Sequence, residues 1–510
     1  MSHQSPPACE SRQGAFSVTG PSQFGNGERA VRTPLHHPLV AGSMVLLVAV
    51  LLLFGRLRLP LLEPDEARYA EIPREMLTTG HWLVPVLHGQ PYYHKPPLLY
   101  WLVMASYQVF GVHDWAARLV PCTACLLTIV VVYFWGLATL GRRTAFAAAM
   151  VLALSVRFIY LGRMLTMDGL LTLGVTSSLA LAHLATRGDQ LRWRWWLASA
   201  VACGLGVLTK GPVALVLVGG AVFLFVLVQR PAGRPRLRNW FAYMAILALV
   251  AGPWYVAVAV RDVVFVREFF WTHHVVRFLT PIDHQKPAWY FIPDLLLGTL
   301  PWSVLLLPLA WFLWRRPTGP APELVFFLLA AGWCVLFFSA AGCKRPAYIL
   351  PALPPLALGL GSYLRIAQWP ARPRLWLAAG VVTFAILLAA VHWLLPPYMR
   401  KFSIRAPVRA ASIRSALPVV CYPHAWDSVH FYLRREDVQV FGKAEWPALR
   451  ATLQSQPATL VFVKSDDRDS HYLSDFRRAL PASLQLAVVG RSGIMTAAIV
   501  QPALTGSQRP

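Results

Sequence analysis

A group of charged residues, Glu63-Pro64-Asp65-Glu66-Ala67-Arg68-Tyr69, directly follows the first long apolar segment of this chain. A carboxylate close to hydrocarbon is costly unless it is paired or lies in a wet cavity, so such residues are functional candidates in membrane proteins. Asp65 has the chemistry of a general base toward a hydroxyl group. Arg68 could bind the oxygens of a phosphate. The segment therefore indicates polar chemistry at one face of a membrane.

Other polar candidates lie further along the same connection and in three later connections between apolar segments. They are His94 and Lys95 in the same first connection, Arg163 and Asp168 in the second, His273, His274 and Arg277 in the third, and Lys344 and Arg345 in the fourth. The cations can neutralise phosphate oxygens, and the imidazoles and carboxylates can bind a divalent metal ion. Together they suit a substrate that has a phosphate head and a lipid tail.

The composition indicates a polytopic membrane protein, because 56% of the residues are hydrophobic, 14% are charged and the mean hydropathy is +0.50. About 20 apolar residues span the hydrocarbon core of a bilayer. About eleven runs approach that length: 38–54, 116–140, 144–161, 169–186, 195–209, 211–229, 240–260, 289–314, 323–341, 346–364 and 374–395. We predict an all-α bundle of about 11 to 13 transmembrane helices. Segment 97–110 is shorter and amphipathic, which favours a helix in the membrane interface.

Arginines occupy alternate loops, and cytoplasmic loops are the ones that carry this excess. They are Arg142 and Arg143, then Arg187, Arg192 and Arg194, then Arg230, Arg234, Arg236 and Arg238, then Arg315 and Arg316, then Arg365, Arg372 and Arg374. The alternation places loops 55–115, 162–168, 262–288 and 341–346 on the outer face, together with everything after about 396. Much of the net charge of +24 follows from this bias, and the arginines and aromatic residues are not arranged in a way that suggests nucleic-acid binding.

The two ends of the chain differ from the apolar middle, 38–395. Residues 1–37 are polar and are expected to form a disordered cytoplasmic tail. Residues 396–510 contain short apolar runs such as 418–422 and 459–463, separated by charged stretches of helical length, which predicts a small α/β domain outside the membrane. Cys122 and Cys125 lie within an apolar run and are read as packing residues.

Several of these segments resemble a known superfamily. They are 65–76 (DEARYAEIPREM), 93–96 (YHKP), 269–278 (FFWTHHVVRF) and 344–351 (KRPAYILP). In this order they look like the bacterial aminoarabinose transferases that modify lipid A, which are grouped with protein O-mannosyltransferases. The resemblance implies a C-type glycosyltransferase fold in the bacterial inner membrane. It also implies inverting transfer of a sugar, 4-amino-4-deoxy-L-arabinose or a hexose, from a polyprenyl-phosphate donor to lipid A or another acceptor at the periplasmic face.

The resemblance also suggests roles for individual residues. Asp65 and Asp168 would be catalytic, and His94 and His274 would hold a zinc-like divalent metal ion. The expected substrate-binding residues are Glu66, Arg68, Lys95, Arg277, Lys344 and Tyr348. The chain departs from the family pattern at His94 and His273, which stand where glutamates are expected; neutral histidine can also bind zinc. Pro73 interrupts the helix predicted around the first motif.

Each residue also has a simpler structural interpretation. Asp65 at the start of a helix could interact with the helix dipole, Asp168 could cap a helix, and Lys95 could extend to lipid headgroups. Their convergence on one face favours a site. A transporter or flippase for lipid-linked sugars is an alternative, but it usually shows paired repeats and broken helices at mid-membrane, and no repeat is visible in the sequence. A sensing scaffold would explain the C-terminal segment but not the motifs.

Overall fold

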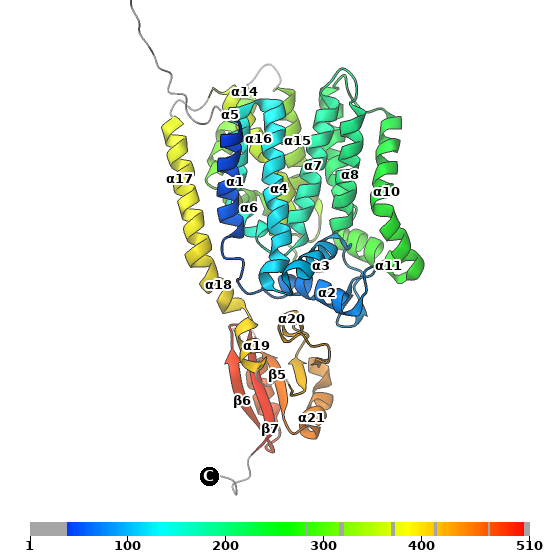
Figure 1. The fold of residues 1–510 in the computed structure, drawn as a ribbon, viewed down its shortest axis with the longest axis vertical. Coiled ribbons are helices and arrows are strands. Elements are labelled where there is room, and N and C mark those ends of the chain that lie inside the picture. Colours follow the sequence, from blue (N-terminus) through cyan, green and yellow to red (C-terminus); the bar gives the residue numbers. More distant parts are fainter. Residues whose placement is uncertain are drawn as a thin grey trace, which may run out of the picture.

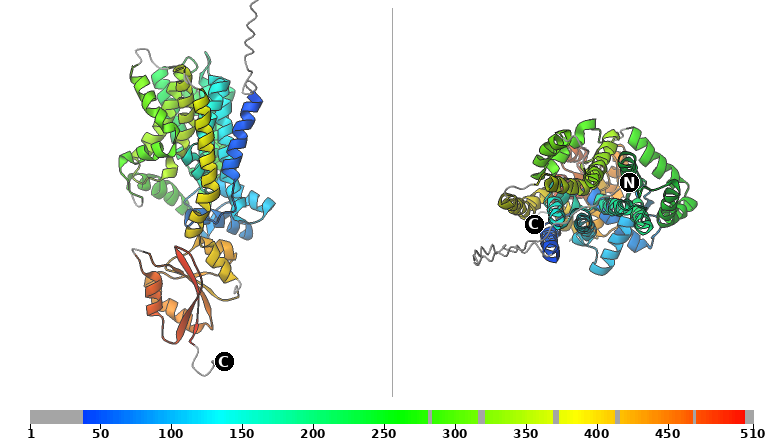
Figure 2. Two further views of the ribbon diagram at one scale, coloured as in Figure 1. Left: turned by 90° about the vertical axis from the view of Figure 1, so that its left-hand side faces the viewer. Right: turned by 90° about the horizontal axis from the view of Figure 1, so that it is seen from above.

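The computed structural model describes residues 38–280, 284–315, 321–368, 373–412, 416–467 and 470–503. The predicted tail at 1–37 lies outside the described residues. Most of the remaining chain is helical, and the longest helices run roughly side by side in one bundle (Figure 1). The C-terminal domain stands at one end of this bundle, and Figure 2 shows the two parts stacked end to end.

The predicted apolar segments form helices. They are α1 (Pro38–Phe54), α4 (Asp114–Leu140), α5 (Arg142–Ala153), α6 (Val156–Gly162), α7 (Met167–Thr186), α8 (Trp193–Lys210), α9 (Val213–Gln229), α10 (Leu237–Arg261), α13 (Phe291–Gly298), α14 (Leu306–Arg315), α15 (Pro322–Ala340), α16 (Leu353–Ile366) and α17 (Pro373–Ala389), which leads into α18 (Leu395–Phe402). Six helices in the described ranges are long and apolar enough to cross a membrane, and two bent pairs raise this number to eight. The helices α1, α3 (Leu98–Phe110) and α9 are apolar but shorter.

Two predicted spans are broken instead of continuous. The pair α5 and α6 bends by 61° at Ser155, whose hydroxyl bonds back to the Val151 carbonyl at 2.7 Å. The segment 288–315 bends by 111° before Trp302, where Pro301 lacks the N–H that an unbroken helix needs. These local breaks are weak signals in a hydropathy profile, because the residues on both sides are equally apolar.

Two amphipathic helices, α2 (Asp65–Thr79) and α3 (Leu98–Phe110), lie across the end of the bundle that faces the C-terminal domain (Figure 1). The transverse course of α3 agrees with an interfacial helix. Its buried residues, including Tyr100 and Tyr107, pack together with residues of α2. Helix α2 continues through Pro73 to Thr79, so the proline does not end it.

The C-terminal domain is a five-stranded mixed sheet with helices, which confirms the predicted small α/β domain. The strand order is β4 (Gln439–Val440), β3 (Val419–Tyr422), β5 (Thr459–Lys464), β7 (Met495–Pro502) and β6 (Leu484–Arg491), and the sheet is parallel from β4 to β5 and antiparallel from β5 to β6. Its helices are α19 (Arg405–Ser412), α20 (Asp427–Leu433), α21 (Trp446–Ser455) and α22 (Tyr472–Ala479). The apolar helical segment that contains α17 and α18 ends at Phe402, and α19 begins at Arg405.

Candidate active site

The first acidic candidate, Asp65, begins α2 and forms an ion pair with Arg345. Arg345 immediately precedes the 3-10 helix η5 (Pro346–Ala352), so residues that are 280 positions apart in the sequence meet here. Both side chains are partly exposed, at 24% for Asp65 and 33% for Arg345, and a bound ligand could therefore reach them. The position of Asp65 at a helix start is thus combined with a specific cationic partner.

The second acidic candidate, Asp168, lies in the first turn of α7 and accepts a hydrogen bond from Nζ of Lys210 at 2.5 Å. The helix cap is Thr166, so Asp168 does not occupy the capping position. The ammonium of Lys210 also lies 4.6 Å from the centre of the Tyr348 ring. Tyr348 belongs to the predicted motif 344–351, so this contact brings that motif close to Asp168.

A cluster of cations surrounds Lys95, which is partly buried in the connection between β2 (Gln90–Pro91) and α3. Burial, together with the positive charges of Lys210, Arg277 and Arg345, lowers the pKa of Lys95 to about 7, while the negative charge of Asp168 acts in the opposite direction. A lowered lysine pKa means that the surroundings disfavour a further positive charge. An anion bound at this point would reverse that effect, so the cluster has the electrostatics of an anion site.

The structure pairs the histidines differently from the prediction. The His94 ring lies 4.0 Å from the His273 ring and 4.5 Å from the Tyr92 ring. Burial lowers the pKa of His94 to about 4, helped by the charges of Lys95, Arg68 and Arg277, and burial also lowers the pKa of His273 to about 3. These imidazoles are neutral at pH 7, so they add no positive charge to the cluster.

His274 lies in the π-helix η2 (Arg267–Val276) and faces the backbone. Its Nδ1 is 2.6 Å from the Phe269 carbonyl oxygen, and its Nε2 lies so close to Gly211 that a Cβ there would be 2.5 Å away. The predicted His94–His274 pair is therefore not formed. The described ranges contain no group of three or more His, Cys, Asp or Glu residues that could hold a metal ion. The predicted metal site does not fit these side chains and stays a prediction.

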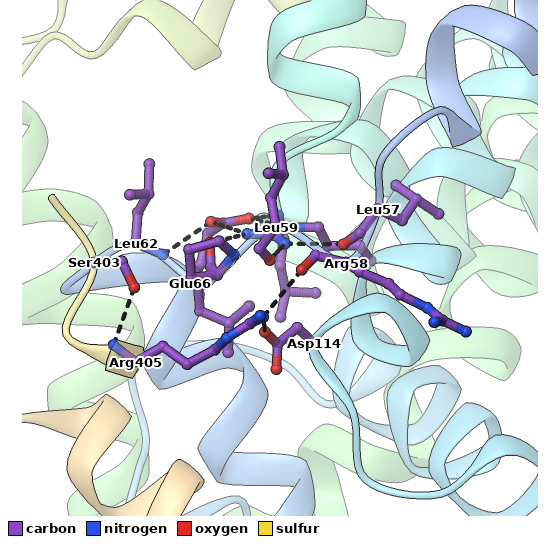
Figure 3. A network of polar contacts seen from close by, with 12 residues as sticks. Leu57, Arg58, Leu59, Leu62, Glu66, Asp114, Ser403 and Arg405 are labelled. Carbon is purple, nitrogen blue, oxygen red and sulfur yellow. Dashed lines mark hydrogen bonds and ion pairs between the residues drawn. The ribbon is translucent and has the colours of Figure 1, made fainter. Parts of the chain in front are cut away.

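Glu66 does not join the cluster, although it is adjacent to Asp65. It is fully buried, and its two oxygens accept hydrogen bonds from Arg118 Nε at 2.8 Å and Nη2 at 2.7 Å. The backbone amides of Leu62 and Leu165 donate to the same carboxylate. Figure 3 shows Glu66 within this network, near the contact of Arg405 with Asp114. The expected substrate-binding role of Glu66 is not supported, because its acceptors are already used by the protein.

Lys344 is also turned away from the cluster. It is 6% exposed, and its Nζ donates to the Ala341 carbonyl at 2.5 Å. Its neighbour Arg345 is the residue that reaches Asp65. The motif 344–351 therefore contributes Arg345, and not Lys344, to the cluster. Which of these two cations reaches the site depends on the direction of each side chain after the end of α15.

Arg68 and Arg277 come to the cluster from different elements. Arg68, on α2, forms an ion pair of 3.2 Å with Asp427 of the C-terminal domain. Arg277 follows η2, and its Nη2 lies 3.9 Å from the Cys343 sulfur. The structure thus brings eight predicted or related residues to one end of the bundle. They are Asp65, Arg68, His94, Lys95, Asp168, Arg277, Arg345 and Tyr348.

Lys210 is a site residue that the four sequence motifs do not contain. It lies between the predicted spans 195–209 and 211–229 and is followed by Gly211-Pro212. The alternation of loops that places Asp168 on the outer face places the 209–212 connection there as well. A single lysine at this junction between two apolar runs is therefore the sequence signal that could have identified Lys210 as a site residue.

Comparisons with known proteins support the resemblance. Residues 94–256 match the family described as dolichyl-phosphate-mannose-protein mannosyltransferase. The undecaprenyl phosphate-alpha-4-amino-4-deoxy-L-arabinose arabinosyl transferase of Yersinia enterocolitica is 37% identical over 309 residues, which cover 59% of this chain and 55% of that protein. The protein of the same description from Aeromonas salmonicida is 37% identical over 308 residues. The chain thus spans about half the length of the curated relatives it matches.

Solved structures confirm the predicted fold class. ArnT from Cupriavidus metallidurans bound to undecaprenyl phosphate covers 92% of this chain, and this chain covers 98% of it, with a TM-score of 0.70 and 21% identity. The archaeal oligosaccharyltransferase AglB from Archaeoglobus fulgidus gives a TM-score of 0.54 over 83% of this chain and 69% of that chain, at 14% identity. The chain is a multi-pass helical membrane protein with the fold of C-type glycosyltransferases.

Proposed function

We propose that this chain is a membrane glycosyltransferase that moves a sugar from a polyprenyl-phosphate donor to lipid A or another acceptor, with inversion at the anomeric carbon. The sugar that the relatives favour is 4-amino-4-deoxy-L-arabinose, the group named in the description of the transferases from Yersinia and Aeromonas. The observation that carries the proposal is the cation cluster around Lys95, flanked by the pairs Asp65–Arg345 and Asp168–Lys210.

The chemistry follows from the leaving group. Breaking the bond between the sugar and the phosphate oxygen leaves the electron pair on a phosphate monoester, whose charge the cations stabilise. These cations are Lys95, Lys210 and Arg277, and the positive charges of Lys210 and Arg277 act on Lys95. Asp168 orients the Lys210 ammonium through their 2.5 Å hydrogen bond. Preorganised charge of this kind costs no rearrangement when the negative charge develops.

The acceptor attacks from the side of the sugar opposite the phosphate, and a single displacement inverts the anomeric carbon. For a hydroxyl acceptor, Asp65 is the base that takes the proton. A phosphate acceptor needs no base, and Asp65 together with Arg345 then orients it. No step is assigned to a metal ion, because the side chains of His94 and His274 are not arranged as a pair of metal ligands in the described part of the chain.

The proposed location is the bacterial inner membrane, with residues before 38 in the cytoplasm and the C-terminal domain in the periplasm. It is supported by the alternating arginines and by the C-terminal domain and α2, which share one end of the bundle (Figure 1). Single cysteines at positions near 80, 275 and 450 should react with an impermeant reagent added outside, and those near 142, 190 and 234 should not. Opposite results for 80 and 275 would contradict a common site.

Lipid analysis tests the activity. Mass spectrometry of lipid A and other membrane glycolipids, with and without the gene product, should show one added sugar that depends on the protein. In vesicles containing the purified protein and undecaprenyl-phosphate aminoarabinose, the sugar should move to added lipid A and leave undecaprenyl phosphate. A flippase would move intact donor between leaflets, and a protein mannosyltransferase would label a polypeptide; either result would replace this proposal.

A further inference from the structure

Helix α20 of the C-terminal domain packs against α2 of the membrane domain at the site. Its first residue, Asp427, has a side chain that is only 6% exposed. One oxygen of Asp427 lies 3.2 Å from Nε of Arg68, and the other lies 3.2 Å from Nε2 of His88. The carboxylate thus reaches from the C-terminal domain to a residue of the first motif.

Several contacts hold Asp427 in this position. The backbone amide of Ser428 donates to Oε1 of Glu63 at 2.6 Å, just before α2 begins. The rings of His88 and His430 stack with centres 4.0 Å apart. Burial and the negative charge of Asp427 raise the pKa of Glu63 to about 7, whereas the positive charge of Arg68 lowers it. The positive charge of Arg68 thus acts on acidic groups on both sides of the domain boundary, Glu63 and Asp427.

We propose that Asp427 is a positioning residue for the donor site: it holds the Arg68 guanidinium so that its terminal Nη groups face the donor phosphate. This inference rests on the proposed function. Arginine is a long side chain that loses much rotational freedom when it binds a ligand, and a fixed guanidinium has already lost that freedom. The ion pair with Asp427 is made by Nε of Arg68. The C-terminal domain would then be part of the site and not an independent module.

A purely structural role, in which Asp427 only joins the domains, makes a different prediction. The experiment uses the full chain in detergent or vesicles and measures the Kd for undecaprenyl phosphate and the KM for the donor. Asp427→Asn should raise both by about tenfold, while kcat changes by less than about twofold, because phosphate binding is lost equally from the ground state and the transition state. The matched control is Glu436→Gln, which removes a charge that contacts Thr78 at 3.2 Å and Arg74 at 4.0 Å in the same interface. Its Kd should equal that of the wild type.

A double-mutant cycle separates positioning from general stability. In an Arg68→Ala background, Asp427→Asn should cause no further loss of affinity, since the residue on which Asp427 acts is gone. An equal loss in both backgrounds, a wild-type Kd for Asp427→Asn, or an equally large loss for Glu436→Gln would overturn the positioning role. If Asp427→Asn does not fold, Asp427→Glu is used in the same cycle and should weaken binding only when Arg68 is present.

The two proposals fail in different ways. If the wild-type protein does not bind undecaprenyl phosphate, the proposed function is wrong and the positioning role is wrong with it. If the wild type binds undecaprenyl phosphate and Asp427→Asn binds it equally well, only the positioning role is wrong.

Discussion

Lys210 at the end of α8 donates a hydrogen bond of 2.5 Å to Asp168 at the start of α7. The two helices can approach closely because glycines face each other: a Cβ added to Gly174 would lie 3.0 Å from the Cα of Gly206. Small residues at a helix interface allow such close packing in membranes. The carboxylate and the ammonium are therefore held by helix packing and not by a mobile loop.

The first prediction concerns the two acids of the site. Asp65→Asn and Asp168→Asn should each lower sugar transfer by about 100-fold or more, because they remove the base or the partner that orients a cation without changing side-chain shape. Transfer is measured in vesicles by mass spectrometry of the lipid product. Asp189→Asn, at an exposed position in the loop between α7 and α8, should transfer at the wild-type rate. If Asp65→Asn transfers the sugar at a rate near that of Asp189→Asn, Asp65 has only a structural role as an acid at the start of a helix.

The second prediction concerns Glu66, whose contacts indicate a structural role. Glu66→Gln should lower the stability of the protein by about 3 kcal/mol or more, because the buried Arg118 guanidinium loses its counter-charge. Thermal unfolding in detergent and the amount of protein in the membrane are the measurements. A second change, Arg118→Gln, should recover part of the stability. A fully stable Glu66→Gln variant with weaker donor binding would instead restore Glu66 to the substrate-binding residues.

The third prediction concerns the pH dependence of phosphate binding. Burial and neighbouring cations lower the pKa of Lys95 to about 7, and a bound phosphate should raise it again by stabilising the charged form. Below the pKa of the free protein the ammonium is already present. Above it, binding must take up a proton, so the Kd should rise as the pH increases from about 7 to about 9. Titration calorimetry in buffers of different ionisation enthalpy measures this proton uptake.

Variants at two lysine positions identify the group that takes up the proton when phosphate binds. Lys95→Arg keeps a positive charge that does not titrate in this range, so the dependence on pH should become weaker. Lys286→Arg, at an exposed position, should retain the wild-type dependence. An unchanged pH profile in Lys95→Arg would show that another group takes up the proton.

The fourth prediction tests the metal. The resemblance predicts a zinc-like ion on His94 and His274, but the structure pairs His94 with His273 and directs His274 to the backbone. From this geometry we expect equal metal content in the wild type and in a His94→Ala, His274→Ala double variant, measured by elemental analysis after purification. A stoichiometric metal ion that is lost in the double variant would confirm the ligand pair and require the two histidines to rearrange.

The amino-acid pattern alone predicts the fold class, the α/β character of the C-terminal segment and the gathering of the polar motifs at one face. Apolar runs of membrane length and alternating arginines are local signals, and the cost of placing charge in hydrocarbon makes them reliable. Asp65, Lys95 and Asp168 could be selected in this way because each lies in a connection that the alternation of arginines places on the outer face.

Which of these groups contact one another depends on how the helices pack. Neighbours in the sequence have opposite environments: Asp65 faces Arg345, whereas Glu66 is buried against Arg118. Successive residues of a helix point about 100° apart, so packing, and not residue type, assigns one carboxylate to the site and the next to the core. The same reason explains why Lys210 and Asp427 were missed, since both reach the site from elements that are distant in the sequence.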